Sequence, residues 1–245
     1  MVSYLNSKPF EFGINSDGYE HFFELILAHP AGCAEMFASE QVDVALIPVG
    51  ALQGLDRYRI VTDYCISCDG EVRTVCLFSD TPIENCSKIW LDDHSRTSFL
   101  LTQVIMEQYF GKNVEYHSGH VEDIIPGVGE AILMIGDKVF GVEQSYKYKY
   151  DLGEIWKKWT GLPFVFAVWV ASEQVDDERI DRLNKALEFG VSHLAQVIDR
   201  VNSESLDLLS YFSKNIFYQL DDRKMEALSL FQSKCKMLKS AKETI

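Results

Sequence analysis

The sequence predicts an α/β protein with a helical C-terminal segment. Three apolar runs, at residues 42–47, 72–78 and 131–135, have the length of buried β-strands. Segments with helical spacing separate these runs, and alternating strands and helices are typical of α/β folds. From about residue 176 to 240 the apolar positions recur every three or four residues, which predicts two or three amphipathic helices.

Two further elements are defined by their ends. Residues 22–28 lie between Gly18 and Pro30, and the length of this segment suits a strand, although its Glu, Leu and Ala residues favour a helix. We predict a strand. The clearest helix is expected to begin at residues 95–98 and to end at Gly111, because hydroxyl side chains cap helix starts and glycine suits the position after a helix. The N-terminus of this helix is a natural anion-binding site, since its first N–H groups have no partner within the helix.

The net charge excludes one class of partner. The chain has 37 acidic and 23 basic residues, which gives a formal charge of −14. Binding to nucleic acid needs concentrated Lys and Arg, so this composition argues against a nucleic-acid partner. An acidic protein also repels small anions at long range, and an anion site must therefore be built locally from hydroxyls, backbone N–H groups and a few bases.

The chain shows no sign of membrane insertion or export. The longest uninterrupted apolar stretch, residues 162–171, is well short of the roughly 20 residues that cross a bilayer. Residues 1–6 carry neither a basic region nor an apolar run of the kind found in signal peptides. We therefore expect a cytoplasmic protein that does not bind membranes and whose six cysteines are reduced.

Metal and redox sites are weakly supported. Cys65 and Cys68 have CxxC spacing, but a structural zinc needs a second ligand pair. His117 and His120 lack the usual spacing for that pair, and the CxxC ends a strand-like run instead of opening a helix. We interpret the two cysteines as unrelated thiols.

Common catalytic motifs are missing from the sequence. It contains no Gly-rich phosphate loop, GxSxG or HExxH, and residues 127–129 form an isolated Gly-containing turn. His94 lies beside two acids just before the predicted helix, where a solvated loop residue is the better interpretation than a catalytic base. The remaining polar candidates carry hydroxyl or amide groups; these are Ser3, Asn6, Thr74, Ser95, Thr97 and Ser98.

These polar residues fall in motifs of a known family. The run VSYLNSKPF at residues 2–10 resembles the opening signature of the chorismate dehydratases, which act in the futalosine pathway of menaquinone biosynthesis. Further motifs resemble those of the family in the same order, at residues 42–49, 68–75, 95–98, 133–137, 151–153 and 156–169. The resemblance extends from residue 2 to about 171, and its last block is long enough to be specific.

The resemblance implies the two-lobed fold of type II periplasmic solute-binding proteins. Lobe I is then expected to contain residues 1–76 and 168–245, and lobe II residues 77–167, with the ligand cleft between the lobes. Apolar runs at 72–79 and 164–171 are the expected crossing strands. The C-terminal helices would return to lobe I.

The family reaction removes water from chorismate, a dicarboxylate, to give 3-[(1-carboxyvinyl)oxy]benzoate. Aromatisation of the ring drives this reaction, so the resemblance implies a hydro-lyase that needs neither a cofactor nor a metal. The work of the protein is then to orient the substrate through hydrogen bonds.

The resemblance also implies roles for individual residues. Asn6 and Thr74 match polar positions near the reacting ring and are expected to be catalytic. The expected substrate-binding residues are Ser3, Ser95, Arg96, Thr97 and Ser98. Arg96 is an alternative partner for Asp69 or Asp137. In the absence of an evident protein base, we hypothesise that the enolpyruvyl carboxylate of the substrate takes the ring proton.

One departure and two alternatives stay open. Family members usually have several residues before the opening signature, whereas here Met1 precedes it directly, so either the first strand is short or the true start lies upstream. The same fold also serves small-anion binding or sensing proteins, which is the first alternative. The second is the related 1,4-dihydroxy-6-naphthoate synthase, whose opening motif differs.

Overall fold

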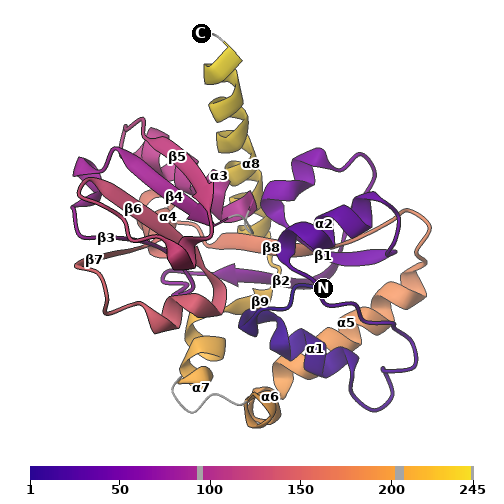
Figure 1. Ribbon diagram of the computed structural model, residues 1–245. Helices are drawn as coiled ribbons and strands as arrows, with labels where there is room; N and C mark the ends of the chain where they lie inside the picture. The colour runs from indigo at the N-terminus through magenta and orange to yellow at the C-terminus, as the bar shows by residue number, and fades with distance from the viewer. Residues whose placement is uncertain (93–95, 202–206, 244–245) are drawn as a thin grey trace. The chain divides into compact units, whose positions relative to one another are not determined.

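The computed structural model describes residues 1–92, 96–201 and 207–243, and Figure 1 labels its helices and strands. The chain forms two compact units. Unit 1 contains Met1–Ser67 and Val165–Asp222, and unit 2 contains Cys68–Phe164 and Arg223–Ile245. Each unit contains one β-sheet and several helices (Figure 1), which confirms the predicted α/β class.

The sheet of unit 1 has four strands in the order β1-β8-β2-β9. The strands are β1 (Val44–Pro48), β8 (Phe164–Ala171), β2 (Arg59–Cys68) and β9 (Phe217–Gln219). β1 and β8 are antiparallel neighbours and are buried along almost their whole length. The apolar runs at 42–47 and 164–171 are therefore strands, as predicted.

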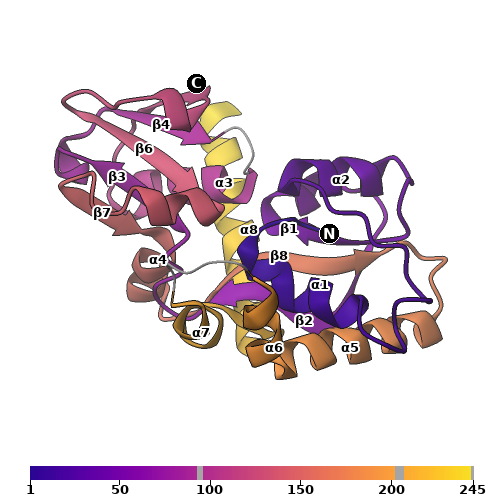
Figure 2. The same cartoon turned by 60° about the horizontal axis from the view of Figure 1, so that its bottom comes forward.

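Helices cover both faces of this sheet. α2 (Pro30–Ala38) lies on one side, and α1 (Lys8–Ile14) and α5 (Asp177–Ser192) lie on the other (Figure 2). α6 (Leu194–Arg200) and the short α7 (Leu208–Ser210) follow α5. The amphipathic pattern after residue 176 thus predicts helices correctly, although β9 interrupts them.

The two helices α1 and α5 touch backbone to backbone. A Cβ atom added to Gly13 would overlap the carbonyl oxygen of Ala186, and one added to Gly190 would overlap the carbonyl oxygen of Pro9. Backbone atoms have no rotamer by which to move aside, so only glycine allows this close approach.

We expect Gly13→Ala and Gly190→Ala each to lower the free energy of unfolding by about 2–3 kcal/mol, because the added methyl group must force the helices apart. Denaturant titration followed by circular dichroism measures the loss. Gly54→Ala is the matched control, since a Cβ at Gly54 meets nothing within 4 Å. Equal stabilities in all three variants would contradict the close contact.

The segment 22–28 is not a strand, contrary to the prediction. Among the described residues, its one β-type pairing is a parallel bridge between Ala28 and Val2. The Ala28 N–H donates to the Met1 carbonyl at 3.0 Å, and the Met1 ammonium donates to the Ile26 carbonyl at 2.6 Å. The segment is extended, but Met1–Ser3 is too short a partner to form a ladder with it.

The sheet of unit 2 has five strands in the order β5-β4-β6-β3-β7. The strands are β5 (Glu115–Gly119), β4 (Lys88–Asp92), β6 (Glu130–Ile135), β3 (Val75–Ser79) and β7 (Tyr148–Asp151). β4 runs parallel to β5 and β6, whereas β3 is antiparallel to β6 and β7. β3 and β6 are the buried runs predicted at 72–78 and 131–135.

Among the residues that the structure describes, unit 2 contains three α-helices. α3 (Arg96–Val104) continues into a π-helical turn at Ile105–Tyr109 and stops before Gly111, which has a φ of 66°. The predicted helix is therefore confirmed from residue 96 onward. α4 (Leu152–Thr160) begins after its N-cap Asp151, and α8 (Asp222–Glu243) is the last helix. Within the described ranges, none of the helices is both long and apolar enough to cross a membrane.

The division of the chain differs from the expected one at the C-terminus. α8 joins unit 2, although residues 168–245 were assigned to lobe I. Its Phe231 ring lies edge-on to Phe164 at 5.0 Å and to the buried Trp156 at 6.0 Å. Burial of these aromatic rings with α4 is the physical reason that α8 belongs to this unit.

The first crossing also differs from the expected one. The chain enters unit 2 after Ser67, at the end of β2, whereas β3 lies wholly inside unit 2 between β6 and β7. The apolar run at 72–79 is thus a core strand and not a crossing. The chain returns to unit 1 after Phe164, within the run 164–171 expected for the second crossing.

Candidate functional site

Several polar segments lie at one end of the strands in the sheet of unit 2. We call this end of the strands the sheet edge of unit 2. The parallel strands β4 and β6 end there, and the antiparallel strand β3 begins there. Thr74 directly precedes β3, and the chain after β4 leads into α3. Thr74 and the end of β4 are two strand spacings apart, or about 10 Å. This edge therefore holds both Thr74 and the start of α3.

Thr74 is nearly inaccessible, with 2% of its surface exposed. Its carbonyl accepts a hydrogen bond from the Gly136 N–H at 2.8 Å, which ties it to the end of β6. The preceding residue, Arg73, has a φ of 66°, in the left-handed region that non-glycine residues rarely adopt. The backbone before Thr74 is thus held in an unfavourable conformation by its surroundings.

Asp151 supplies that constraint. Its buried carboxylate accepts hydrogen bonds from the N–H groups of Val72 at 3.1 Å, Arg73 at 2.7 Å and Glu154 at 3.0 Å. One side chain therefore caps α4 and fixes the loop that leads to Thr74. Asp151 lies in the family motif at residues 151–153, which by itself implies no role for it, although an aspartate three residues before Glu154 is a recognisable helix-start pattern.

Burial controls the protonation of the groups around Asp151. Burial raises the pKa of the Asp151 carboxyl, while its three N–H partners act in the opposite direction. Burial also raises the pKa of the Cys76 thiol, whose sulfur lies 3.7 Å from Asp151 Oδ2. Cys76 therefore remains a protonated thiol that donates to the carboxylate.

We expect Asp151→Ala to lower the free energy of unfolding by about 3–5 kcal/mol, because three N–H groups lose their acceptor. Asp151→Asn should also destabilise, since its amide would point a donor at the Arg73 or Val72 N–H. The control is Asp176→Ala, which removes the exposed cap of α5 and should cost about 1 kcal/mol. Similar losses for Asp151→Ala and Asp176→Ala in thermal melts would argue against the role given to Asp151.

The first turn of α3 carries the predicted carboxylate-binding residues. Thr97 and Ser98 are each 3% exposed, whereas Arg96 is exposed. Ser95 and His94 lie outside the described residues. The first turn of α3 thus carries two buried hydroxyls, and the N-terminus of a helix favours negative charge, so this surrounding suits a carboxylate.

A charged pair that no sequence motif indicates lies at the same edge. Lys138 follows β6, and its ammonium lies 2.5 Å from the carboxylate of Asp92 at the end of β4. The side chain of Asp92 is 2% exposed, so this ion pair is well shielded. Asp69, which is one of the two alternative partners expected for Arg96, forms an ion pair with Lys157 instead.

Ser3 and Asn6 lie together in unit 1, at the turn that leads into α1. The Ser3 N–H donates to the Ala28 carbonyl at 3.1 Å. Asn6 lies in a 3₁₀ turn, Leu5–Ser7, and its carbonyl accepts a hydrogen bond from the Tyr218 hydroxyl at 3.0 Å. Both Ser3 and Asn6 are partly exposed.

Buried groups hold this turn in place. Burial raises the pKa of Tyr218 well above its usual value, so its hydroxyl stays protonated and donates to Asn6. The Ser7 hydroxyl lies 2.7 Å from the Val2 carbonyl and 2.9 Å from that of Tyr4. Phe10, the next apolar anchor, is completely buried and lies edge-on to the Tyr218 ring at 5.3 Å.

The remaining candidates have simpler structural roles. Cys65 and Cys68 are buried free thiols within β2, and burial raises the pKa of Cys68. Their position inside a strand supports the interpretation as unrelated thiols. Among the residues that the structure describes, no group of three or more His, Cys, Asp or Glu side chains could hold a metal ion.

Comparison of the sequence with known proteins gives two consistent matches. A family model described as menaquinone biosynthesis matches residues 1–237. A curated relative, the chorismate dehydratase of Thermus thermophilus, is 23% identical over 256 residues. That alignment covers 94% of this chain and 92% of the relative.

Solved structures resemble the whole chain. Protein AF1704 from Archaeoglobus fulgidus matches with a TM-score of 0.69 at 15% identity, covering 100% of this chain and 97% of the other. A periplasmic transporter matches with a TM-score of 0.60 at 9% identity, covering 99% and 94%. At these identities the matches establish the fold alone, which is periplasmic-binding-protein-like. Because the family model covers nearly the entire sequence, this chain belongs to the menaquinone biosynthesis family.

Proposed function

We propose that this protein is a chorismate dehydratase, a hydro-lyase that converts chorismate to 3-[(1-carboxyvinyl)oxy]benzoate and water. The observation that carries the proposal is the end-to-end relation to a curated chorismate dehydratase within a menaquinone-biosynthesis family. A biosynthetic role of this kind agrees with a cytoplasmic location, which is part of the proposal.

The proposed reaction needs orientation more than reactive side chains. Chorismate loses its ring hydroxyl and a ring hydrogen, and the electron pair of the broken C–H bond completes the aromatic ring. A protein assists by holding two carboxylates in fixed positions and by donating a hydrogen bond to the departing hydroxyl. The buried hydroxyls and helix start of unit 2 have the chemistry for these tasks.

We assign the residues to these tasks as follows. Asn6 and Thr74 contact the reacting ring, and the hydroxyl of Thr74 donates to the leaving group. Buried hydroxyls at the first turn of α3 receive a carboxylate. The substrate-binding set is Ser3, Ser95, Arg96, Thr97 and Ser98.

The ring proton is taken, in this proposal, by the enolpyruvyl carboxylate of the substrate itself. Two buried acids at the sheet edge of unit 2 are engaged elsewhere, which supports this assignment. Asp151 accepts three backbone N–H groups, and Asp92 is paired with Lys138. The proton then passes to the departing hydroxide, so that one water is released.

Purified protein incubated with chorismate should form a product lighter by one water, without added nucleotide or metal. Liquid chromatography with mass detection measures the conversion, and heat-denatured protein is the control. Tight chorismate binding without turnover would instead indicate a binding or sensing protein of the same fold. Conversion of a later pathway intermediate to 1,4-dihydroxy-6-naphthoate, with chorismate left intact, would indicate the related synthase.

Asn6→Ala and Thr74→Ala should each lower kcat by about 100-fold or more, because each removes a group that contacts the reacting ring. Thr74→Ser should keep most of the activity, since it retains the hydroxyl. The matched control is Ser39→Ala, an exposed hydroxyl at the end of α2, which should leave kcat unchanged. Wild-type rates in Asn6→Ala and Thr74→Ala, with melting temperatures also unchanged, would disprove the assignment.

A further inference from the structure

The ion pair between Lys138 and Asp92 lies in the middle of the sheet edge of unit 2. In the strand order, β6 is the neighbour of both β4 and β3. Gly136 directly follows β6 and donates to the Thr74 carbonyl at 2.8 Å, and Lys138 follows in the same 3₁₀ turn. Asp92 is the last residue of β4, which leads into α3. The pair therefore lies between Thr74 and the start of α3.

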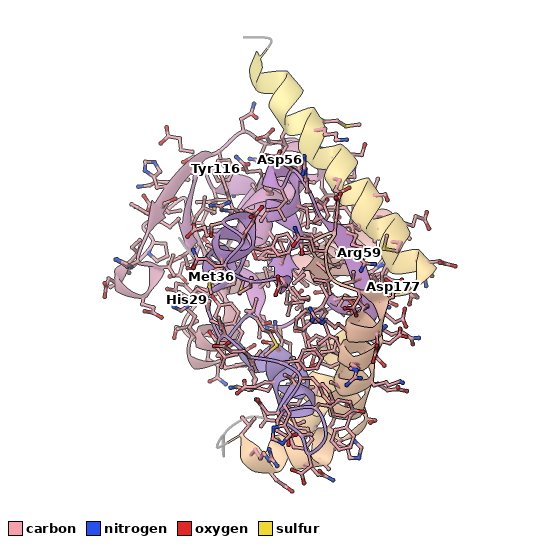
Figure 3. All side chains as sticks on the ribbon, turned by 90° about the vertical axis from the view of Figure 1, so that its right-hand side faces the viewer. His29, Met36, Asp56, Arg59, Tyr116 and Asp177 are labelled. Atoms are coloured by element: carbon pink, nitrogen blue, oxygen red, sulfur yellow. The ribbon has the colours of Figure 1, made fainter. Side chains whose placement is uncertain are left out.

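Packing attaches α3 to the strands that carry this pair. The first turn of α3 contains the buried residues Thr97 and Ser98. The next residue, Phe99, lies edge-on to the ring of Tyr116 at 5.8 Å. Tyr116, which is labelled in Figure 3, belongs to β5, and β5 pairs with β4. The two buried hydroxyls and the ion pair are thus parts of one packed unit.

The two members of the ion pair differ in exposure. The side chain of Asp92 is 2% exposed, whereas that of Lys138 is 25% exposed. An anion that approaches this edge therefore meets the ammonium before the carboxylate. Because the pair has no net charge, its attraction for an anion acts only at short range.

Lys138 has donors to spare. An ammonium group has three N–H donors, and the contact with Asp92 Oδ2 uses one of them. Among the described residues, its other ionic partner is Glu122, whose carboxylate is 3.7 Å away and 70% exposed. This distance is too long for a hydrogen bond. Glu122 shows that a second carboxylate can approach the ammonium while Asp92 stays in contact with it.

The chemistry of the proposed reaction indicates which carboxylate profits from such an ammonium. When the ring C–H bond breaks, its electron pair spreads through the adjacent ring double bond onto the ring carboxylate before it expels the hydroxide. The ring carboxylate therefore gains negative charge in the transition state, and a cation beside it lowers the barrier. The enolpyruvyl carboxylate has the opposite need, because a cation beside it would make it a weaker base.

We propose that Lys138 is a further substrate-binding residue, whose ammonium binds the ring carboxylate of chorismate. Asp92 is then a positioning residue that holds the ammonium in place. The ring carboxylate replaces Glu122 as the second partner of Lys138. This inference rests on the proposed function and adds a charged contact to it.

The first test is the loss of the charge. Lys138→Met should lower kcat for chorismate dehydration by about 10- to 100-fold and also raise KM, because it removes a donor to the charge that develops. Lys138→Arg should keep most of the activity, since it retains a cation. The matched control is Lys88→Met at the start of β4, where the lysine is 24% exposed and paired with Glu130. The control should leave kcat and KM unchanged.

A purely structural role for the ion pair predicts a different result in a double variant. Lys138→Met leaves a buried carboxylate without its cation, whereas Asp92→Asn combined with Lys138→Met removes both charges. The double variant should regain melting temperature relative to Lys138→Met, but its kcat should stay about 10-fold or more below that of the parent. Recovery of the parent kcat in the double variant would overturn the proposal.

Glu122→Gln provides a measurement that leaves the ion pair intact. It removes the competing carboxylate and should lower KM for chorismate about threefold. The matched control is Glu115→Gln, a similarly exposed acid on β5 that contacts His117, and its KM should equal that of the parent. An unchanged KM in Glu122→Gln would contradict the displacement of Glu122.

The parent chain separates failure of this inference from failure of the proposed function. A parent that does not remove water from chorismate would refute both. An active parent with equal kcat and KM in Lys138→Met would refute the inference alone. A raised KM with unchanged kcat would also overturn the assignment, because Lys138 would then contact a carboxylate that gains no charge.

Discussion

Asp151 satisfies three backbone N–H groups with one buried carboxylate, and the sheet edge of unit 2 depends on this arrangement. The N–H groups of Val72 and Arg73 lie outside regular secondary structure, where a buried donor without a partner is costly. The same carboxylate caps α4. It therefore fixes the chain before Thr74, so that the Thr74 hydroxyl belongs to a rigid element.

In unit 1, neutral hydroxyl groups hold the turn that carries Asn6 in place. Tyr218 donates to the Asn6 carbonyl, and the Ser7 hydroxyl contacts two carbonyls of the same turn. Behind this turn, α1 approaches α5 so closely that Gly13 and Gly190 have no room for a side chain. Ser3 and Asn6 in unit 1 and Thr74 in unit 2 thus lie on short irregular segments that buried hydrogen bonds hold against a rigid core.

The charge of the chain explains why such rigidity matters for an anionic substrate. At a net charge of −14, long-range attraction does not bring a dianion to the protein. Binding must come from short-range hydrogen bonds, and these are strongest when donors are already in position. Even the Lys138 ammonium lies against a buried carboxylate, so the edge of unit 2 is neutralised locally.

Several features could be predicted from the sequence because they depend on local pattern. Continuous apolar runs predict β1, β3, β6 and β8, since strands buried on both faces contain few polar residues. Hydroxyl residues before an amphipathic segment predict the start of α3. The motif order predicts the menaquinone biosynthesis family, which the family match confirms. The roles of Ser3, Asn6, Thr74 and residues 95–98 remain predictions.

Only the tertiary structure decided the features that depend on contacts between residues far apart in the chain. Residues 22–28 have the length of a strand, but a strand also needs a neighbour, and Met1–Ser3 supplies a single bridge. α8 has the pattern of any amphipathic helix, and its packing in the folded chain, with Phe231 against Phe164 and Trp156, assigns it to unit 2. Asp151 resembles an ordinary helix cap until the fold brings Val72 and Arg73 to it. Sequence pattern determines which segments are buried and with what period, whereas pairing depends on residues that are remote in the chain.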